Sequence, residues 1–454
     1  MCLVGVFMFV LIKTFKTNFK SDTTNLVWVV DSITGVNETT EKRLNQILKD
    51  NGYEYEISFR CVDFFSDDKK DPVSKIEKLK NEQVDILCIP INKSNYSGHS
   101  VGLEMVNKNL LVCLDGEFSK ETLKTMQSKG ISLATTINGK HYGISTVGIC
   151  ASKTCWYADY DWLEKSNLQV SDLKNKELWQ ITELLNNDKN TSDVIMDIGE
   201  CDSMLLNLKY EFITDYIGVR LDDDSCTIRN ILEDEYTIEY LDALHELAMK
   251  GTLSKNDFKN AALYLSNVEY MSHASQDEGK QEIAVWKDYY SYNLTNMQQG
   301  VASWSKHKSE AKKVLEILFT DEEIQMYLNY GSDCEDYKFQ NGKVIDQNQK
   351  EQFNDGWSDF LVGDFSYLRK YASEDILCSP VIGFTFDDSG LEDDLKKLQL
   401  IYDEAEKNYF YVFEDENVYK KKIHQLHKKL RNSGISEIQK EISRQLESYK
   451  NVGG

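Results

Sequence analysis

The chain has 454 residues, too many for one ordinary hydrophobic core, and two or three units are expected because domains usually hold about 100 to 200 residues. A hydrophobic content of 41% with 11% aromatic residues excludes a disordered chain. The net charge of −23 repels phosphate backbones and anionic headgroups, which argues against nucleic acid as a partner; solubility is its simplest explanation.

The N-terminal segment is an apolar run, CLVGVFMFVLI, followed by three lysines. A bilayer span needs about 20 residues, so this run instead fits the core of a signal peptide or a clipped anchor. Cys2 is a candidate for lipidation, but a lipidated cysteine normally precedes a polar tether, and Leu3–Ile12 is apolar. An uncleaved or mis-started signal segment is therefore favoured over acylation. Residues 1–21 are expected to be a signal- or anchor-like segment, and the rest of the chain is expected to be exported.

The ten cysteines form no CxxC pair, and Cys150 with Cys155 alone is no zinc signature. Cys88 and Cys113 lie in the apolar stretches DILCIP and LLVCLD, so both are predicted to be buried free thiols. Disulfides among the other cysteines stay open. No metal and no cofactor is expected.

The first part of the chain alternates strands and helices. Strands are predicted at residues 25–31, 53–62 and 84–90, and helices at residues 41–49 and 73–79. This βαβαβ order predicts a parallel sheet wrapped by helices, with ligands beyond the carboxyl ends of the strands, at residues 31–36 and 92–97.

The middle of the chain begins with a hairpin signal, Asn138-Gly139. A helix at 178–185, a strand at 193–198, a hairpin at 217–232 and a helix at 237–250 ended by Gly251 are then expected. Asp222 to Asp224 lack the glycine and the distal glutamate of an EF-hand loop, so a solvated turn is favoured over a calcium site.

Residues 309–331 predict two consecutive helices. Ser309 is the expected cap of the first, and the apolar side of that helix is formed by Ala311, Val314, Leu315, Leu318 and Phe319. Thr320 with Glu323 forms the capping-box pattern that starts the second, with Ile324, Tyr327 and Leu328 inward and Gly331 at its end.

The tail from residue 391 onward predicts three helices, in which Gly434 ends the second. The last carries one apolar stripe, formed by Ile435, Ile438, Ile442 and Leu446. The stripe is too short for the three to four heptads that a coiled coil needs.

Motifs of catalysis are missing from the sequence: it contains no GxSxG and no Walker or Rossmann glycine loop. His424 and His427 are three residues apart on a lysine-rich helix and are predicted to be solvated rather than metal-bound. A glycosidase using two of the 75 carboxylates stays open, without a motif to support it.

Four segments, in order, resemble the extracellular solute-binding proteins of bacterial ABC importers, and most closely their large sugar-binding lipoproteins. INGKHYGIST is similar to their first crossover, with Ser145 in place of a proline. ASKTCWYADYDWLEKSNLQ is similar to the strand and helix that follow it, with Asn167 in a glycine position that asparagine tolerates. The third segment is residues 303–331, and the fourth is the tail KKLRNSGISEIQKEISRQLESY. The resemblance covers residues 22–450.

The resemblance implies an α/β, two-lobed periplasmic-binding-protein-like fold with hinge crossovers and an α-helical C-terminal tail. Lobe 1 would comprise residues 22–145 and 288–345, and lobe 2 residues 146–287 and 346–390. Residues 391–454 would form helices packing on the lobes. Lys280 to Tyr290 would return the chain to lobe 1, and Ser303 to Ser305 would face the cleft.

The function so implied is the capture of a carbohydrate between two lobes and its delivery to ABC permease subunits, without catalysis. The protein would be monomeric, extracellular and anchored to the membrane through its N-terminus. Two alternatives stay open: an exported carbohydrate-active enzyme and a peptide-binding surface module.

Sugars present apolar C–H faces and many hydroxyls, so their sites combine aromatic rings with carboxylates and amides. The candidates near the predicted lobe edges are Asp31, Tyr96, Trp156, Tyr157, Trp286, Tyr289 and Trp357. Trp286 and Trp357 are favoured among them, because both stand in polar, loop-like contexts.

Overall fold

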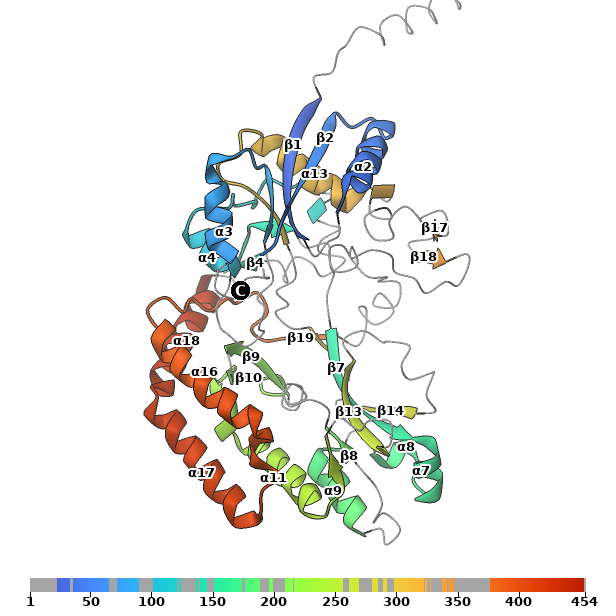
Figure 1. The fold of residues 1–454 in the computed structure, drawn as a ribbon, viewed down its shortest axis with the longest axis vertical. Helices are drawn as coiled ribbons and strands as arrows, with labels where there is room; N and C mark the ends of the chain where they lie inside the picture. Colours follow the sequence, from blue (N-terminus) through green and yellow to red (C-terminus); the bar gives the residue numbers. More distant parts are fainter. Residues whose placement is uncertain are drawn as a thin grey trace, which may run out of the picture.

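The computed structural model describes residues 23–452 with internal gaps, and its buried apolar side chains fall into two separate cores. The gaps are 33–35, 65–71, 90–100, 121, 124–135, 138, 145–150, 174–175, 188–195, 199–208, 215, 256–260, 269–279, 285–288, 292–297, 322, 325–326, 328–336, 341–342 and 347–375. Figure 1 shows the two lobes one above the other, with the C-terminal helices along one side of the lower lobe.

The first lobe is built on a five-stranded sheet in the order β2-β1-β3-β16-β6. Its strands are β1 (Thr24–Asp31), β2 (Tyr55–Val62), β3 (Ile86–Ile89), β6 (Gly143–Ile144) and β16 (Gln298–Val301). β1 is parallel to β2 and β3, as the βαβαβ pattern predicts, whereas β16 is antiparallel to β3 and to β6. The sheet is therefore mixed. Its antiparallel strand, β16, is the one that the chain enters from the other lobe.

The helices of the first lobe include α2 (Glu38–Asp50), α3 (Pro72–Glu77) with a 3-10 turn (Lys78–Asn81), α4 (Val101–Asn107) and α13 (Lys308–Thr320). α2 starts at a capping box formed by Asn37 and Thr40 and buries Leu44, Ile47 and Leu48. Two short hairpins belong to this part of the sequence: β4 (Thr136–Ile137) with β5 (Lys140–His141), and β17 (Tyr337–Gln340) with β18 (Lys343–Asp346).

The expected caps around α13 are wrong, although its buried side is right. Ala311, Val314, Leu315 and Leu318 are buried, but the N-cap is His307, with no side-chain hydrogen bond, and not Ser309. The Thr320 hydroxyl bonds back to Glu316 O, and Asp321 Oδ1 accepts from Ile324 N at 3.0 Å. Asp321 therefore caps the next turn, in which Ile324 and Tyr327 are buried as predicted. The side chain of Phe319, and Leu328 and Gly331, lie outside the described part.

The second lobe holds a sheet in the order β12-β8-β13-β7-β15-β19, with β14 also paired to β7. Its strands are β7 (Ala151–Asp159), β8 (Met196–Asp197), β12 (Leu253–Ser254), β13 (Leu263–Val268), β14 (Lys280–Ala284), β15 (Tyr289–Ser291) and β19 (Ile376–Cys378). Because β15 pairs with β7 and β19, the chain is still in the second sheet at Ser291. The predicted lobe boundary at residue 288 is thus too early, and the return to lobe 1 falls between Ser291 and Gln298.

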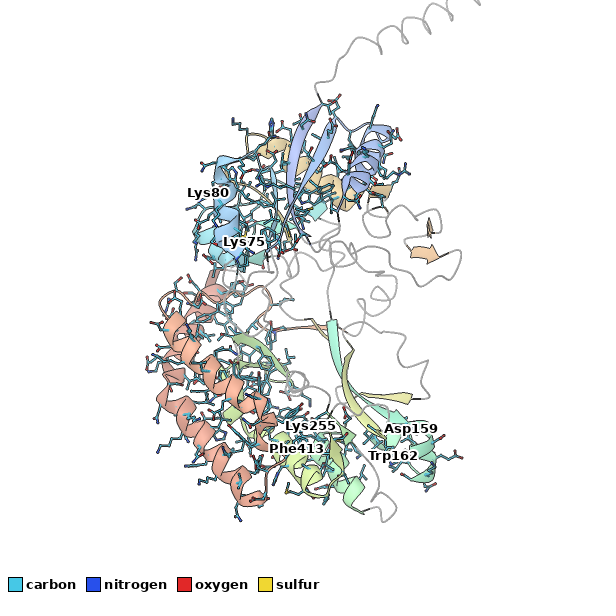
Figure 2. All side chains as sticks on the ribbon, in the orientation of Figure 1. Lys75, Lys80, Asp159, Trp162, Lys255 and Phe413 are labelled. Carbon is cyan, nitrogen blue, oxygen red and sulfur yellow. The ribbon has the colours of Figure 1, made fainter. Side chains whose placement is uncertain are left out.

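Helices of the second lobe are α7 (Tyr160–Lys165), α8 (Val170–Leu173), α9 (Leu178–Asn187) and α11 (Glu235–Met249). Asp159 caps α7 by accepting from Trp162 N at 3.0 Å, and both residues are labelled in Figure 2. Gly251 follows α11 with φ of +71°, and Asn167 has φ of 53°, so both left-handed positions are as predicted.

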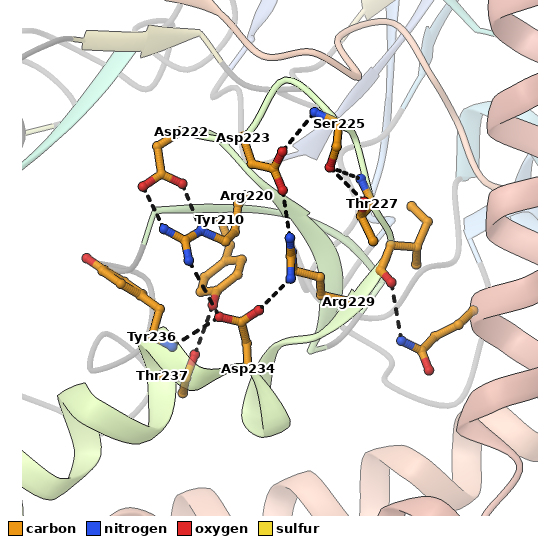
Figure 3. A network of polar contacts seen from close by, with 12 residues as sticks. Tyr210, Arg220, Asp222, Asp223, Ser225, Thr227, Arg229, Asp234, Tyr236 and Thr237 are labelled. Carbon is orange, nitrogen blue, oxygen red and sulfur yellow. Dashed lines mark hydrogen bonds and ion pairs between the residues drawn. The ribbon is translucent and has the colours of Figure 1, made fainter.

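A smaller sheet, β9 (Tyr210–Thr214), β10 (Ile217–Arg220) and β11 (Arg229–Asn230), carries the acidic turn. Figure 3 shows its polar network. Arg220 binds Asp222 through Nε at 2.8 Å and a terminal nitrogen at 2.7 Å, and Arg229 binds Asp223 at 2.6 Å. The two carboxylates are paired with arginines of the same sheet, where a solvated turn was expected.

The tail forms α16 (Glu392–Lys407), α17 (Glu416–Asn432) and α18 (Ile435–Val452). The predicted stripe is confirmed, since Ile435, Ile438, Ile442 and Leu446 are buried in the core of the second lobe. His427 is not solvated: it is half-buried and its Nε2 lies 2.9 Å from Leu232 O. Burial lowers the pKa of His427.

A left-handed turn separates α16 from α17. Tyr409, Phe410 and Tyr411 have φ of 49°, 48° and 65°, which is unfavourable for L-residues, and the burial of Phe410 and Tyr411 compensates. The Lys255 ammonium lies 4.0 Å from the Tyr409 ring centroid and 4.1 Å from that of Phe413. Lys255 and Phe413 are labelled in Figure 2. The turn is thereby joined to the chain that follows β12.

Candidate functional site

The chain passes between the two sheets at two places where, in each sheet, the strand next to one passage is paired with the strand next to the other. β6 ends at Ile144 and β7 begins at Ala151; β15 ends at Ser291 and β16 begins at Gln298. In the first sheet Ile144 pairs with Gln299, and in the second sheet Ala151 pairs with Ser291. Two adjacent crossings between two sheets are the arrangement of a hinge.

Both crossings meet the first sheet at its carboxyl edge. β1 and β3 end at this edge with Asp31 and Ile89, and the antiparallel β16 starts there, with Gln298 opposite Ile89. Ligands of open α/β sheets bind beyond the carboxyl ends of the parallel strands. The carboxyl edge of the first sheet is therefore the candidate site.

Asp31 occupies the end of β1 at this edge. Its side chain is buried, and Oδ2 accepts from Phe64 N at 3.3 Å. The carboxylate thus holds the chain just after β2 against the end of β1. The sequence placed Asp31 at this edge correctly, and the structure adds that one of its oxygens serves the fold.

One face of the sheet carries a polar group around Gln299. The Trp28 Nε1–H donates to Gln299 Oε1 at 2.8 Å, and the ring of Trp28 lies 5.3 Å from that of Phe59. Cys88, opposite Gln299 in the ladder, is fully buried, and burial raises the pKa of its thiol to about 12. These contacts tie β1, β3 and β16 together just inside the edge.

Gln298 stands at the edge itself, beside Gly143 of the outgoing strand. An added Cβ on Gly143 would lie 2.8 Å from Ile89 Cδ1, 2.9 Å from Gln298 Cβ and 3.0 Å from Gln298 Oε1. Only glycine leaves room there for the Gln298 side chain. In the ladder, Gly143 itself pairs with Gly300 of β16. Neither strand carries a side chain at this pair, so the two crossing strands approach closely.

The serines of 303–305 lie at the opposite edge, so the prediction that they face the cleft is wrong. β16 runs antiparallel to β3, and its carboxyl end therefore reaches the amino end of β3. Ser305 Oγ donates to Asp85 Oδ1 at 2.5 Å, while Asp85 Oδ2 accepts from Val27 N at 2.9 Å. Ser303 Oγ donates to Asn109 O at 2.6 Å. Both hydroxyls support the first lobe away from the site.

The other predicted site residues are placed only in part. Trp156 and Tyr157 belong to β7 and Tyr289 to β15, the strands next to the two crossings. Tyr96, Trp286 and Trp357 lie outside the described residues. The sequence reasoning missed Gln298 at the edge, and it missed Trp28 and Gln299, which support the sheet behind that edge. The signal for Gln298 and Gln299 was an amide pair, followed by glycine, opening an otherwise apolar strand.

Among the residues that the structure describes, no group of three or more His, Cys, Asp or Glu side chains is arranged to hold a metal ion. None of the helices in that part of the chain has the length and apolar character needed to cross a membrane. Cys113, predicted to be buried, is exposed, although Leu111 and Leu114 on either side of it are buried.

Comparison with known proteins agrees with this architecture. A domain of unknown function, DUF3502, matches residues 380–451, and a comparison with curated proteins found no match. The N-glycan transport solute-binding protein NgtS of Streptococcus pneumoniae has a TM-score of 0.67 and 16% identity, covering 94% of this chain and 98% of its own. An extracellular solute-binding protein of Bifidobacterium longum subsp. infantis has a TM-score of 0.61 and 14% identity, with coverages of 95% and 100%.

A third similar structure is the ABC-transporter substrate-binding protein FusA of S. pneumoniae in complex with kestose. Its TM-score is 0.56 at 12% identity, with coverages of 94% and 100%. At such identities the shared fold is what the likeness establishes. The chain therefore has the two-lobed α/β fold of the extracellular solute-binding proteins, and its residues 380–451 match the DUF3502 domain.

Proposed function

We propose that this protein is the extracellular substrate-binding component of an ABC importer and captures a carbohydrate between its two lobes. The observation that carries the proposal is the pair of adjacent crossings at the carboxyl edge of the first sheet. Such a hinge lets a ligand that touches both lobes stabilise the closed state, so that binding shifts the population of conformations. No reaction is needed for this task.

The solved relatives support a sugar as the ligand. NgtS is described as transporting N-glycans, and FusA was solved with kestose. An oligosaccharide is the ligand class that these two descriptions share. Asp31 and the aromatic residues proposed from the sequence remain the candidate contacts: Tyr96, Trp156, Tyr157, Trp286, Tyr289 and Trp357.

The proposed partners are ABC permease subunits, which would receive the sugar. The protein would act outside the cell as a monomer, held to the membrane by its N-terminal segment. Lobe 1 would comprise residues 22–145 and the part from the return crossing to residue 345, and lobe 2 the residues between the crossings together with 346–390. The tail belongs to the core of lobe 2.

Binding to purified protein tests the proposal directly. We expect a panel of kestose, oligomannose and maltotetraose to include at least one sugar that raises the stability of the protein, by about 2.7 kcal/mol at 100 times its dissociation constant. Small-angle scattering with that sugar should show a smaller radius of gyration. Stabilisation by peptides alone would favour the peptide-binding module, and release of shorter sugars would favour the enzyme.

A further inference from the structure

Gln298 is the residue at which the return crossing enters the first sheet. It pairs with Ile89, the last residue of β3, and its side chain lies over Gly143 of the outgoing strand. One carboxamide therefore touches both strands of the hinge and stands at the edge where ligands of this architecture bind.

The carboxamide lacks a hydrogen bond that its position demands. Gln298 is 8% exposed, and its Oε1 is closed to water with no donor within reach among the residues that the structure describes. Of these residues, Ile89 is its ladder partner and Gly143 lies beside it. A buried acceptor without a donor is unfavourable and rare in folded proteins, so a donor is expected from outside the first lobe.

The adjacent Gln299 makes the contrast clear. It is 1% exposed and lies on the other face of β16, where its Oε1 accepts from Trp28 Nε1 at 2.8 Å. Gln299 thus has its oxygen engaged and leaves only its Nε2 without a partner in the described structure, whereas Gln298 leaves its oxygen without one.

We propose that the carboxamide of Gln298 is a ligand contact in the hinge, where it hydrogen-bonds a hydroxyl of the bound carbohydrate. This inference rests on the proposed function. A glutamine amide both accepts and donates, and a half-turn about its last torsion exchanges oxygen and nitrogen. The place of Gln298 at the start of β16, on the carboxyl edge of the sheet, is where ligands of this architecture bind.

The test compares two substitutions of similar size, Gln298→Met and Gln299→Met, using titration calorimetry with whichever of kestose, oligomannose and maltotetraose the wild type binds. We expect Gln298→Met to weaken binding about tenfold, as for the loss of one well-formed hydrogen bond, without lowering the melting temperature. Gln299→Met should lower the melting temperature, because Trp28 Nε1 loses its acceptor, and should change the affinity less than about twofold. Gln298→Leu also replaces the carboxamide with an apolar side chain and should give the same result as Gln298→Met.

Deoxy analogues of the same sugar separate a contact from an indirect effect. If Gln298 binds one hydroxyl, Gln298→Met should lose nothing further with the analogue that lacks this hydroxyl. An equal loss with every analogue would mean a shifted hinge equilibrium and would overturn the proposal, as would unchanged affinity of Gln298→Met or a fall in its melting temperature. If the wild type binds none of the sugars, the proposed function itself fails instead.

Discussion

The imidazole of His245 in α11 stacks on the ring of Tyr419 in α17, with ring centroids 4.1 Å apart and planes at 13°. His245 is buried, and its Nδ1 lies 2.9 Å from Val412 O and its Nε2 3.0 Å from Glu416 Oε2. Each ring nitrogen thus lies within hydrogen-bond distance of an oxygen of the tail. One side chain of the second lobe thereby holds the start of α17 in the tail.

Removal of this imidazole should loosen the tail. We expect His245→Ala to lower the free energy of unfolding by about 3 kcal/mol, because two hydrogen bonds and the stacking are lost and a cavity remains. Urea denaturation followed by circular dichroism measures this. The exposed His424→Ala in α17 is the matched control and should stay within about 0.5 kcal/mol of the wild type. Equal effects of the two substitutions would contradict the assignment.

Asp234 is the buried centre of the network in Figure 3. It lies 3.1 Å from Arg229 and 3.8 Å from Arg220, and its Oδ1 accepts from Tyr236 N at the start of α11. Asp234→Ala should cost about 3 kcal/mol, since two arginines lose a buried partner and α11 loses its cap. Asp222→Ala, at a more exposed pair, should cost under about 1 kcal/mol. Chemical denaturation of both variants checks the order, and a larger loss for Asp222→Ala would refute it.

The same network predicts sensitivity to acid. Hydrogen bonds from Ser225 and then the Arg229 guanidinium lower the pKa of Asp223 to about 2, from 3.8. A lowered pKa in the folded state stabilises the protein above the unfolded value, and this contribution is lost as the pH falls from 3.8 towards 2. The difference in melting temperature between wild type and Asp223→Asn should therefore be present at pH 6 and shrink in that window. Asp224→Asn, which changes no ion pair of the described structure, should show no such trend.

The thiols of Cys88 and Cys113 should differ in their reactivity towards an alkylating reagent. Cys88 is fully buried with a raised pKa, whereas Cys113 is exposed. Iodoacetamide at pH 8 should label Cys113 in the native protein and Cys88 only after unfolding in urea, because the thiolate is the reactive form and the reagent must reach it. Peptide mapping by mass spectrometry reads both sites at once. Native labelling of Cys88 at the rate of Cys113 would show that the core around β3 is open.

Local patterns in the sequence correctly predicted the faces of helices whose position depends only on burial. The stripe from Ile435 to Leu446 and the buried side of α13 are examples, because one face of a helix packs on one core. Caps were harder to predict. Thr320 and Asp321 are both good caps, and the choice depends on where α13 stops against the first lobe. His427 was misjudged because its partner, Leu232 O, is 195 residues away in the sequence.

The sequence by itself determined the alternating strands and helices of the first part of the chain and the helical tail, since hydrophobic periodicity and turn residues are local. The two lobes and the first crossing were expectations from the resemblance to solute-binding proteins. The tertiary structure decided which strand edge carries the candidate site. The antiparallel entry of β16 places Gln298 at the carboxyl edge and Ser305 at the other, and the pairing of β15 with β7 moves the return crossing past Ser291. Strand direction and pairing arise from contacts between distant segments, which no local pattern encodes.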